Sequence, residues 1–187
     1  MRWGVFLDRD GTLVPNAHHP TRPDQLKLYR STLPGLKLLR GSGAKLLVAS
    51  NQSVVARGML SEAGLRAMDR YLKQLVRQGG TSLQGAYYCP HHPDFSRACA
   101  CRKPKAGLLR QGLKEHGLKA GACYMVGDSK TDLQAGRALG MKTVLVLTGY
   151  GRSVRSAALR NKLADHITSN VYGAAKWILR DRALTKV

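Results

Sequence analysis

The chain has 187 residues, enough to bury a proper hydrophobic core and within the usual size of one domain. Its 31 lysines and arginines against 11 aspartates and glutamates give a net charge of +20, which favours anionic partners. Only 6% of the residues are aromatic, whereas nucleic-acid binders interleave basic with stacking aromatic residues, so we expect no specific nucleic-acid partner. No apolar stretch is long enough for a membrane span and no secretory signal is visible, so we expect a cytoplasmic protein that does not enter the membrane.

Short apolar runs alternate with helical patterns along the chain. The runs predict strands near 3–7, 44–49, 83–88, 122–127 and 142–147, and the patterns predict helices near 32–42, 61–78, 105–116, 131–139 and 171–184. This alternation indicates βαβ units, a doubly wound and mainly parallel α/β sheet of Rossmann-like type with helices on both faces. We expect one domain over residues 1–187 with no large cap, because no long insertion separates the motifs, and we interpret the basic stretch 152–160 as a solvated helix face.

The first apolar run, Val5-Phe6-Leu7, ends in Asp8 and Asp10, followed by Gly11 and Thr12. Parallel α/β sheets bind ligands at the carboxyl ends of their strands, where these aspartates lie. Alternation along a strand predicts that both carboxylates leave on the same side. Two neighbouring carboxylates cannot both ionise cheaply without a cation, so the pair implies a divalent metal, a shared proton or both, and Mg²⁺ fits best.

Other polar clusters follow later strands and precede later helices. The second strand runs into hydroxyl and amide groups that suit a phosphate, and two cations come before a predicted helix. The strand near 122–127 ends in further carboxylates. These clusters are Ser50-Asn51-Gln52-Ser53, Arg102-Lys103-Pro104, and Asp128 with Asp132.

Three of the four cysteines are close in sequence. Cys89-Pro90-His91 and Cys99-Ala100-Cys101 offer three thiolates and an imidazole, the ligand set of a closed tetrahedral zinc site. His92 is an alternative to His91 as the imidazole ligand. The loop at about 89–105 is polar and cannot form its own apolar core, so bound zinc would fold it and would position Arg102 and Lys103.

Together these motifs resemble the haloacid dehalogenase superfamily, whose members mostly transfer phosphoryl groups through an aspartyl-phosphate. The resemblance implies that Asp8 is the nucleophile, that Asp10 is the general acid and base, and that Ser50 and Lys103 hold the transferred phosphoryl group. It also implies Mg²⁺ binding by the carboxylates of Asp8 and Asp128 and the backbone carbonyl of Asp10.

The resemblance is sharper for one family, the bacterial D-glycero-D-manno-heptose 1,7-bisphosphate 7-phosphatases, which supply activated heptose for lipopolysaccharide or S-layer glycans. It rests on Phe6-Leu7-Asp8-Arg9-Asp10-Gly11-Thr12, Asn51-Gln52-Ser53 with Ala56-Arg57-Gly58, Tyr87-Tyr88-Cys89-Pro90-His91-His92-Pro93, Cys99-x-Cys101-Arg102-Lys103-Pro104 and Tyr124-Met125-Val126-Gly127-Asp128. It implies catalytic Mg²⁺, structural Zn²⁺ and a small sugar bisphosphate as substrate, and we expect a monomer.

Substrate contacts form the last set of predictions. Arg102 suits the second, anomeric phosphate, and the family places a sugar-binding loop at Asn16 to His19. Asn51, Gln52, Ser53 and Ser129 complete the expected contacts, although the family usually has Lys where this chain has Ser129. Asp132 either supports the metal site or caps the helix that follows.

Two alternatives stay open. A histidinol-phosphate or other sugar-phosphate phosphatase would share the aspartate motif and the zinc loop. A polynucleotide 3′-phosphatase or a nucleic-acid-binding protein would account for the charge of +20, which the family does not explain.

Overall fold

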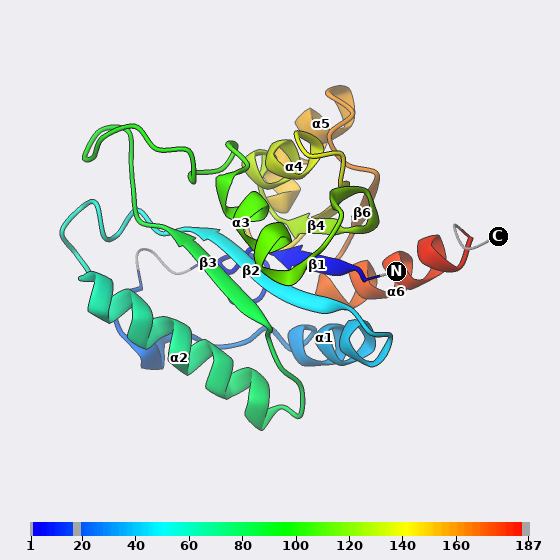
Figure 1. The fold of residues 1–187 in the computed structure, drawn as a ribbon, viewed down its shortest axis with the longest axis horizontal. Coiled ribbons are helices and arrows are strands. Elements are labelled where there is room, and N and C mark those ends of the chain that lie inside the picture. Colours follow the sequence, from blue (N-terminus) through cyan, green and yellow to red (C-terminus); the bar gives the residue numbers. More distant parts are fainter. Residues whose placement is uncertain (1, 17–19, 185–187) are drawn as a thin grey trace.

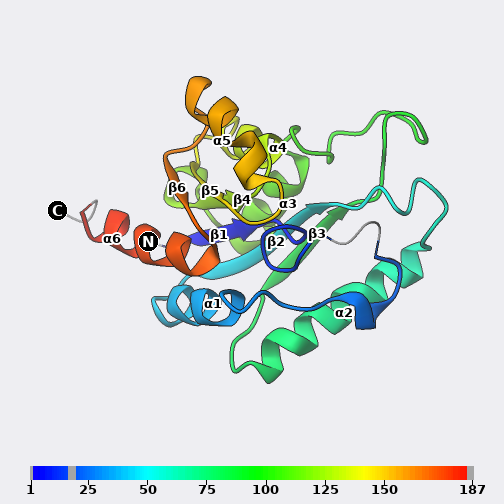
Figure 2. The same ribbon diagram turned by 180° about the vertical axis from the view of Figure 1, so that it is seen from behind.

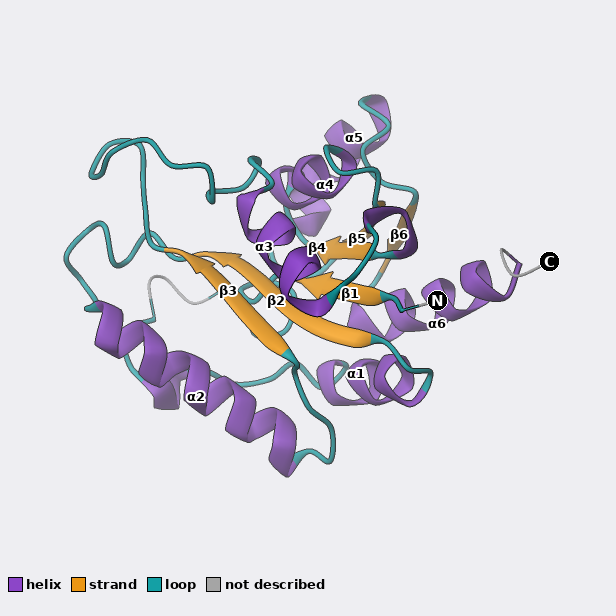
Figure 3. Cartoon of the chain, viewed as in Figure 1, coloured by secondary structure: helices purple, strands orange, loops and turns teal. Residues whose placement is uncertain are grey.

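The computed structural model describes residues 2–16 and 20–184. Its centre is a parallel sheet whose strands follow the order β3-β2-β1-β4-β5-β6 (Figures 1 and 3). The strands are β1 Gly4–Leu7, β2 Lys45–Asn51, β3 Gly85–Cys89, β4 Tyr124–Gly127, β5 Lys142–Val146 and β6 His166–Thr168. This order reverses between β1 and β4, so the crevice above their carboxyl ends is the place where such sheets bind ligands.

Helices cover both faces of the sheet, as the alternation of strand and helix patterns predicts. On one face lie α1 Thr32–Gly41, α2 Glu62–Gln78 and α6 Val171–Leu184, and on the other lie α3 Gly107–His116, α4 Lys130–Arg137 and α5 Gly151–Arg160 (Figures 1 and 2). Two short 3₁₀ turns, Pro23–Gln25 and Ala120–Ala122, complete the elements. The doubly wound α/β fold is therefore confirmed.

Two apolar cores follow from the alternation of side chains along β1. Val5 and Leu7 pack with α1, α2 and α6, whereas Phe6 packs on the opposite face with Leu109 of α3 and Met125 of β4. All three β1 side chains are fully buried, which explains why this strand is uniformly apolar. The core thus fixes β1 in the middle of the sheet and places Asp8 just beyond its end.

The fold differs from the expectation mainly at β6. This strand has three residues, His166–Thr168, all of them half-buried, and pairs with β5 at the edge of the sheet. A short edge strand that is neither fully buried nor clearly alternating gives almost no pattern in the sequence. The basic stretch after residue 150 forms α5, whose buried residues are Gly151 and Ala158, so its charged side chains face outward as expected.

Within the described residues, no helix has both the length and the apolar character needed to cross a membrane.

Candidate active site

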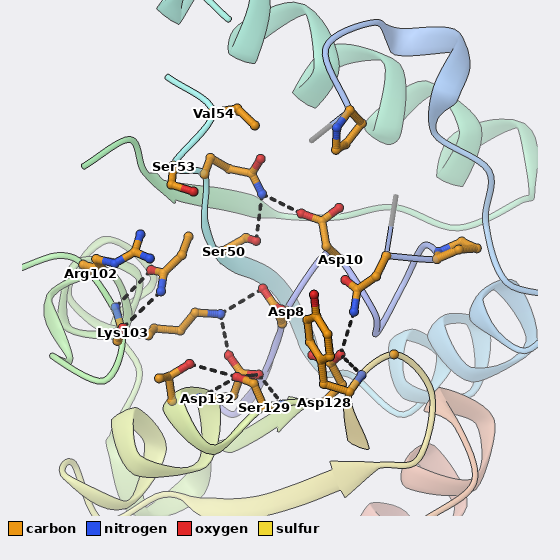
Figure 4. A pocket seen from close by; sticks show the side chains of 18 of the residues that line it. Asp8, Asp10, Ser50, Ser53, Val54, Arg102, Lys103, Asp128, Ser129 and Asp132 are labelled. Atoms are coloured by element: carbon orange, nitrogen blue, oxygen red, sulfur yellow. Dashed lines mark hydrogen bonds and ion pairs between the residues drawn. The ribbon is translucent and has the colours of Figure 1, made fainter. Parts of the chain in front are cut away.

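Three buried carboxylates meet beyond the carboxyl ends of β1 and β4. Asp8 follows β1, Asp128 follows β4, and Asp132 lies on the first turn of α4, with one carboxylate oxygen of each within 4.8 Å of the others (Figure 4). Burial, together with the charges of Asp8 and Asp132, raises the pKa of Asp128 to about 7. The raised pKa means that the negative charges of the three acids repel one another and that the nearby groups do not fully neutralise them.

Lys103 supplies a buried cation to this cluster. Its Nζ lies 2.8 Å from Oδ1 of Asp8 and 2.6 Å from Oδ1 of Asp132, and it donates a hydrogen bond of 2.6 Å to the carbonyl of Ala49. Burial alone would lower the pKa of Lys103, but Asp132 and Asp8 outweigh it and raise the pKa, so the amine is charged. The side chain of Asn51 at the end of β2 holds Lys103 in place, because it accepts from the Lys103 N–H and donates to the Lys103 carbonyl, both at 3.0 Å.

Asp10 has a cation of its own. Arg9 donates from Nε and Nη2 to the two oxygens of Asp10 at 3.1 and 2.9 Å, and Gln52 donates from Nε2 to Oδ2 at 2.7 Å. Both motif aspartates line the same cavity, as expected, and each also pairs with a side-chain cation, Asp8 with Lys103 and Asp10 with Arg9.

Two glycines, Gly11 and Gly149, lie against the Asp128 carboxylate at positions where a side chain would not fit. Gly11 and Gly149 have φ of +78° and +52°, and a Cβ on either would collide with Oδ2 of Asp128. That oxygen accepts hydrogen bonds from the Tyr150 N–H at 2.7 Å and from Nδ2 of Asn16 at 3.2 Å. Only residues without a side chain can approach the carboxylate this closely in a left-handed conformation.

The charges at the site fit a divalent cation. Among the described residues two buried cations, Lys103 and Arg9, face the carboxylates of Asp8, Asp10, Asp128 and Asp132, which carry two negative charges in excess when all four are ionised. Clustered carboxylate oxygens are the ligands that Mg²⁺ prefers. The residues present therefore fit the predicted metal.

A cavity of about 760 Å³ opens above these groups. It brings together residues from the ends of β1, β2 and β4 and from the loop before α3, as Figure 4 shows. Every described residue expected to act in catalysis, in Mg²⁺ binding or as a substrate contact lines it: Asp8, Asp10, Asn16, Ser50, Asn51, Gln52, Ser53, Arg102, Lys103, Asp128 and Ser129. The remaining predicted contact, His19, lies outside the described residues.

Ser129 and Asp132 both contribute to the start of α4. The Ser129 side chain caps the helix by accepting from the Asp132 N–H, while Oδ2 of Asp132 accepts from the Ser129 N–H at 3.0 Å and from its hydroxyl at 2.7 Å. Asp132 is fully buried and also pairs with Lys103. It thus serves both roles that the sequence left open, since it belongs to the cap and supports the carboxylate cluster.

The predicted zinc ligands also meet, beyond the end of β3. One ligand atom from each of Cys89, His91, Cys99 and Cys101 lies within 4.8 Å of the others. Sγ of Cys101 is 3.0 Å from Sγ of Cys89 and 3.3 Å from Nδ1 of His91. Nδ1 of His92 instead accepts from the Asp94 N–H, and the His92 ring lies 5.3 Å from the Phe95 ring at an angle of 46°, so His91 is the imidazole that lies in the cluster.

The pKa values of the cysteine cluster shift in both directions. Burial raises the pKa of the Cys89 and Cys101 thiols. Burial alone would also raise the pKa of Cys99, but hydrogen bonds, the Arg102 N–H first among them, lower it to about 7. The cluster is joined to the cavity because Arg102 follows Cys101 directly and donates from Nη1 to the His91 carbonyl at 2.8 Å.

Sequence reasoning missed several residues that build the site. Arg9 stands between the two motif aspartates, and a charged residue at the end of a buried strand was a usable signal. Gly149 and Tyr150 come soon after β5, and this position beyond the end of a parallel strand was the sequence signal that they belong to the site. The clamp of Asn51 on Lys103 joins residues 52 positions apart and has no local signature.

The parallel fold and the acidic site beyond β1 and β4 define a hydrolase of the haloacid dehalogenase type. The HAD-hydrolase-like family model matches residues 100–174. A D-glycero-beta-D-manno-heptose-1,7-bisphosphate 7-phosphatase from Pasteurella multocida is 37% identical over 154 residues, covering 80% of this chain and 84% of the relative. The enzyme of the same name from Escherichia coli K12 is 32% identical over 185 residues, which cover 96% of this chain and 89% of that enzyme.

A solved structure is also similar. It is the D,D-heptose 1,7-bisphosphate phosphatase from B. bronchiseptica complexed with magnesium and phosphate, with a TM-score of 0.86, 29% identity and coverage of 97% of this chain and 99% of that one. The chain therefore belongs to the D-glycero-beta-D-manno-heptose-1,7-bisphosphate 7-phosphatase family, within the haloacid dehalogenase-type phosphatases. The predicted superfamily, enzyme class and family are confirmed.

Proposed function

We propose that this protein removes the 7-phosphate of D-glycero-D-manno-heptose 1,7-bisphosphate through an aspartyl-phosphate intermediate. The observation that carries this proposal is a second cation in the cavity. Arg102 and Lys103 enter from the same side (Figure 4), but Lys103 is bound to Asp8 whereas Arg102 is held through Nη1 by the His91 carbonyl. A bisphosphate offers one anion to the reacting centre and a second to Arg102, whose planar guanidinium suits a phosphate.

The proposed reaction uses two steps on one nucleophile. A carboxylate oxygen of Asp8 attacks phosphorus, the bond from phosphorus to the sugar oxygen breaks, and Asp10 gives its proton to that oxygen. Asp10 then takes a proton from water as the water attacks the aspartyl-phosphate, releasing inorganic phosphate and restoring Asp8. Ser50 and Lys103, which line the cavity beside Asp8, hold the phosphoryl oxygens through these steps.

Mg²⁺ fits the carboxylates of Asp8 and Asp128 and the backbone carbonyl of Asp10. When bound, it supplies positive charge that offsets repulsion between a carboxylate nucleophile and an anionic phosphate. Asp132 keeps Lys103 beside Asp8, at 2.6 and 2.8 Å from the two carboxylates. The glycines at 11 and 149 leave the space in which Asp128 faces the other acids.

Zinc is proposed as a structural ion held by Cys89, His91, Cys99 and Cys101. The loop that contains these ligands is short of apolar residues and carries Arg102 and Lys103 to the cavity, so its order decides their positions. Purified protein should contain about one tightly bound zinc per chain that survives mild chelation, while activity follows added Mg²⁺. Elemental analysis that finds no zinc in protein never treated with strong chelators would contradict the assignment.

The substrate is tested by phosphate release from heptose 1,7-bisphosphate, heptose 7-phosphate, histidinol phosphate and a 3′-phosphorylated oligonucleotide at physiological salt. We expect the bisphosphate to be preferred, and we expect Arg102→Ala to reduce kcat/KM for it about ten- to a hundredfold more than for the monophosphate. Lys103→Ala is the matched comparison, because it should impair both substrates alike. An equal loss with Arg102→Ala would reject the second-phosphate role, and a preference for histidinol phosphate or the oligonucleotide would establish one of the alternatives.

We further propose that the whole chain acts as one catalytic domain and as a monomer in the cytoplasm. Light scattering on purified protein tests whether it is a monomer, and cell fractionation tests whether it is cytoplasmic.

A further inference from the structure

Arg9 is an unusual residue for the place it occupies. It is 1% exposed, and among the described residues its Nη1 has no hydrogen-bond partner. Burying a guanidinium is costly unless its charge is paired, and an apolar side chain could fill the same space without that cost. Two hydrogen bonds to the Asp10 carboxylate, from Nε to Oδ1 at 3.1 Å and from Nη2 to Oδ2 at 2.9 Å, offset the desolvation of the Arg9 guanidinium.

Gln52 closes the arrangement around Asp10. Its side chain is also buried, at 3% exposure, although its sequence position suggests a substrate contact. Oε1 accepts from Nη2 of Arg9 at 2.7 Å, and Nε2 donates to Oδ2 of Asp10 at 2.7 Å and to Oγ of Ser50 at 3.1 Å. The amide is oriented by this network, because only its oxygen can face the arginine donor.

Support for Arg9 comes from the side of α2. Its guanidinium carbon lies 6.0 Å from the centre of the half-buried Tyr88 ring, and the Tyr88 hydroxyl donates to Oδ1 of Asp69 at 3.0 Å. Asp69 in turn pairs with Lys73 at 2.7 Å. The Arg9 guanidinium therefore contacts Tyr88 on the side of α2 and Asp10 on the side of the cavity.

The two oxygens of Asp10 differ as a result. Within the part of the chain that the structure describes, Oδ2 accepts two hydrogen bonds, from Arg9 and Gln52, whereas Oδ1 accepts one, the longer bond from Nε of Arg9. Asp10 lines the cavity and its side chain is 22% exposed, so one of its oxygens can reach a substrate. Oδ1 has the spare lone pair for that contact.

We propose that Arg9 and Gln52 are positioning residues that fix the Asp10 carboxylate and leave Oδ1 as the oxygen that exchanges the proton. This inference rests on the proposed function, because it takes Asp10 as the acid and base of the reaction. In the first step Oδ1 gives its proton to the leaving sugar oxygen, and in the second it takes one from the attacking water. Arg9 does not line the cavity and acts through Asp10, whereas Gln52 orients Asp10 and also donates to Oγ of Ser50 at the cavity wall.

A double-mutant cycle with Arg9→Met and Asp10→Asn tests this role. In the wild-type background, Arg9→Met should lower kcat about ten- to a hundredfold on a sugar phosphate with KM changed less than about threefold, because proton transfer and not binding is impaired. In the Asp10→Asn background the same substitution should change kcat less than about threefold, since the group it positions is gone. Arg9→Lys should restore part of the activity.

The control is Arg182→Met. Arg182 lies 3.9 Å from the centre of the Trp3 ring, at the amino-terminal edge of the sheet, so it tests the loss of a partly buried arginine away from the cavity. Its kcat should equal that of the wild type. Equal losses from Arg9→Met in both backgrounds would overturn the proposal, because Arg9 would then act independently of Asp10.

A crystal structure of Arg9→Met gives a readout that does not depend on activity. We expect the Asp10 carboxylate to move or to occupy more than one rotamer, and a single unchanged position would overturn the proposal. If Arg9→Met does not fold, Gln52→Met provides the same cycle and the same structural readout. A wild-type protein inactive on every phosphate ester would reject the proposed function, whereas the Asp10 position in the crystal structure still reports whether Arg9 holds it.

Discussion

Asp128→Asn should make the protein more stable without Mg²⁺ while it removes Mg²⁺ binding. The pKa of Asp128 lies at about 7 because of burial and the charges of Asp8 and Asp132, compared with an ordinary value of 3.8. The folded protein therefore holds this proton more tightly than the unfolded chain, and its free energy of unfolding falls as the pH rises from about 4 through 7. A shift of about three pKa units corresponds to a cost of at most about 4 kcal/mol at pH 8.5.

The asparagine side chain can keep the local hydrogen bonds, because its oxygen can accept from the Tyr150 N–H and from Asn16 as Oδ2 of Asp128 does. Allowing for relaxation of the coupled acids, we expect the variant to gain about 1–3 kcal/mol at pH 8.5 and about half of that at pH 5.5, where the unfolded carboxyl is already ionised while the folded one is still protonated. Urea unfolding in buffer without divalent cations measures both values.

Two comparisons complete this test. Asp24→Asn, at an exposed carboxylate that pairs with the exposed Arg22, should leave the free energy of unfolding nearly unchanged at both pH values. Added Mg²⁺ should stabilise the wild type by about 2.7 kcal/mol at a hundred times its dissociation constant, and should not stabilise Asp128→Asn. An Asp128→Asn protein no more stable than the wild type at pH 8.5, or equally stabilised at pH 5.5, would refute the charge argument.

Three further substitutions examine other parts of the site. Asp8→Asn should abolish phosphate release while circular dichroism stays native, because the amide cannot accept the phosphoryl group; turnover by a well-folded variant would reject a covalent mechanism. Asn51→Ala removes two hydrogen bonds of 3.0 Å to the Lys103 backbone and should cost about 1–3 kcal/mol of unfolding free energy and lower kcat, and an unchanged kcat would mean that Lys103 needs no clamp. Gly149→Ala should destabilise the protein and weaken Mg²⁺ binding in calorimetry, since its Cβ would collide with the Asp128 carboxylate at a φ of +52°; unchanged affinity would contradict that reading.

The sequence predicts most of the fold because the central strands are apolar throughout. β1, β2, β4 and β5 are buried on both faces, so short apolar runs mark them, and helices of ordinary length separate them. β6 cannot be predicted in this way. Its three residues are half-buried at the edge of the sheet, so they form no apolar run, and pairing with β5 stabilises the strand.

The candidate site is predictable where it depends on strand ends and not where it depends on long-range contacts. Asp8 and Asp128 each follow an apolar strand, Ser50 lies near the end of another, and parallel strands bring their carboxyl ends to one edge. The pairing of Lys103 with Asp132 and the bonds of Gln52 to Arg9 and Asp10 follow from the path of loops after those strands. Side-chain networks of this kind join distant residues and leave no periodic trace in the sequence.

The loop between β3 and α3 connects the two predicted metal sites. Cys89 at the end of β3 holds one end of the loop beside Cys101, and Asn51 at the end of β2 holds Lys103 two residues later. Lys103 is therefore fixed from two neighbouring strands, and its Nζ reaches Asp8 beyond a third. A flexible lysine positioned in this way needs little reordering when substrate binds, and the proposed zinc would secure that position by ordering a polar loop that has no core of its own.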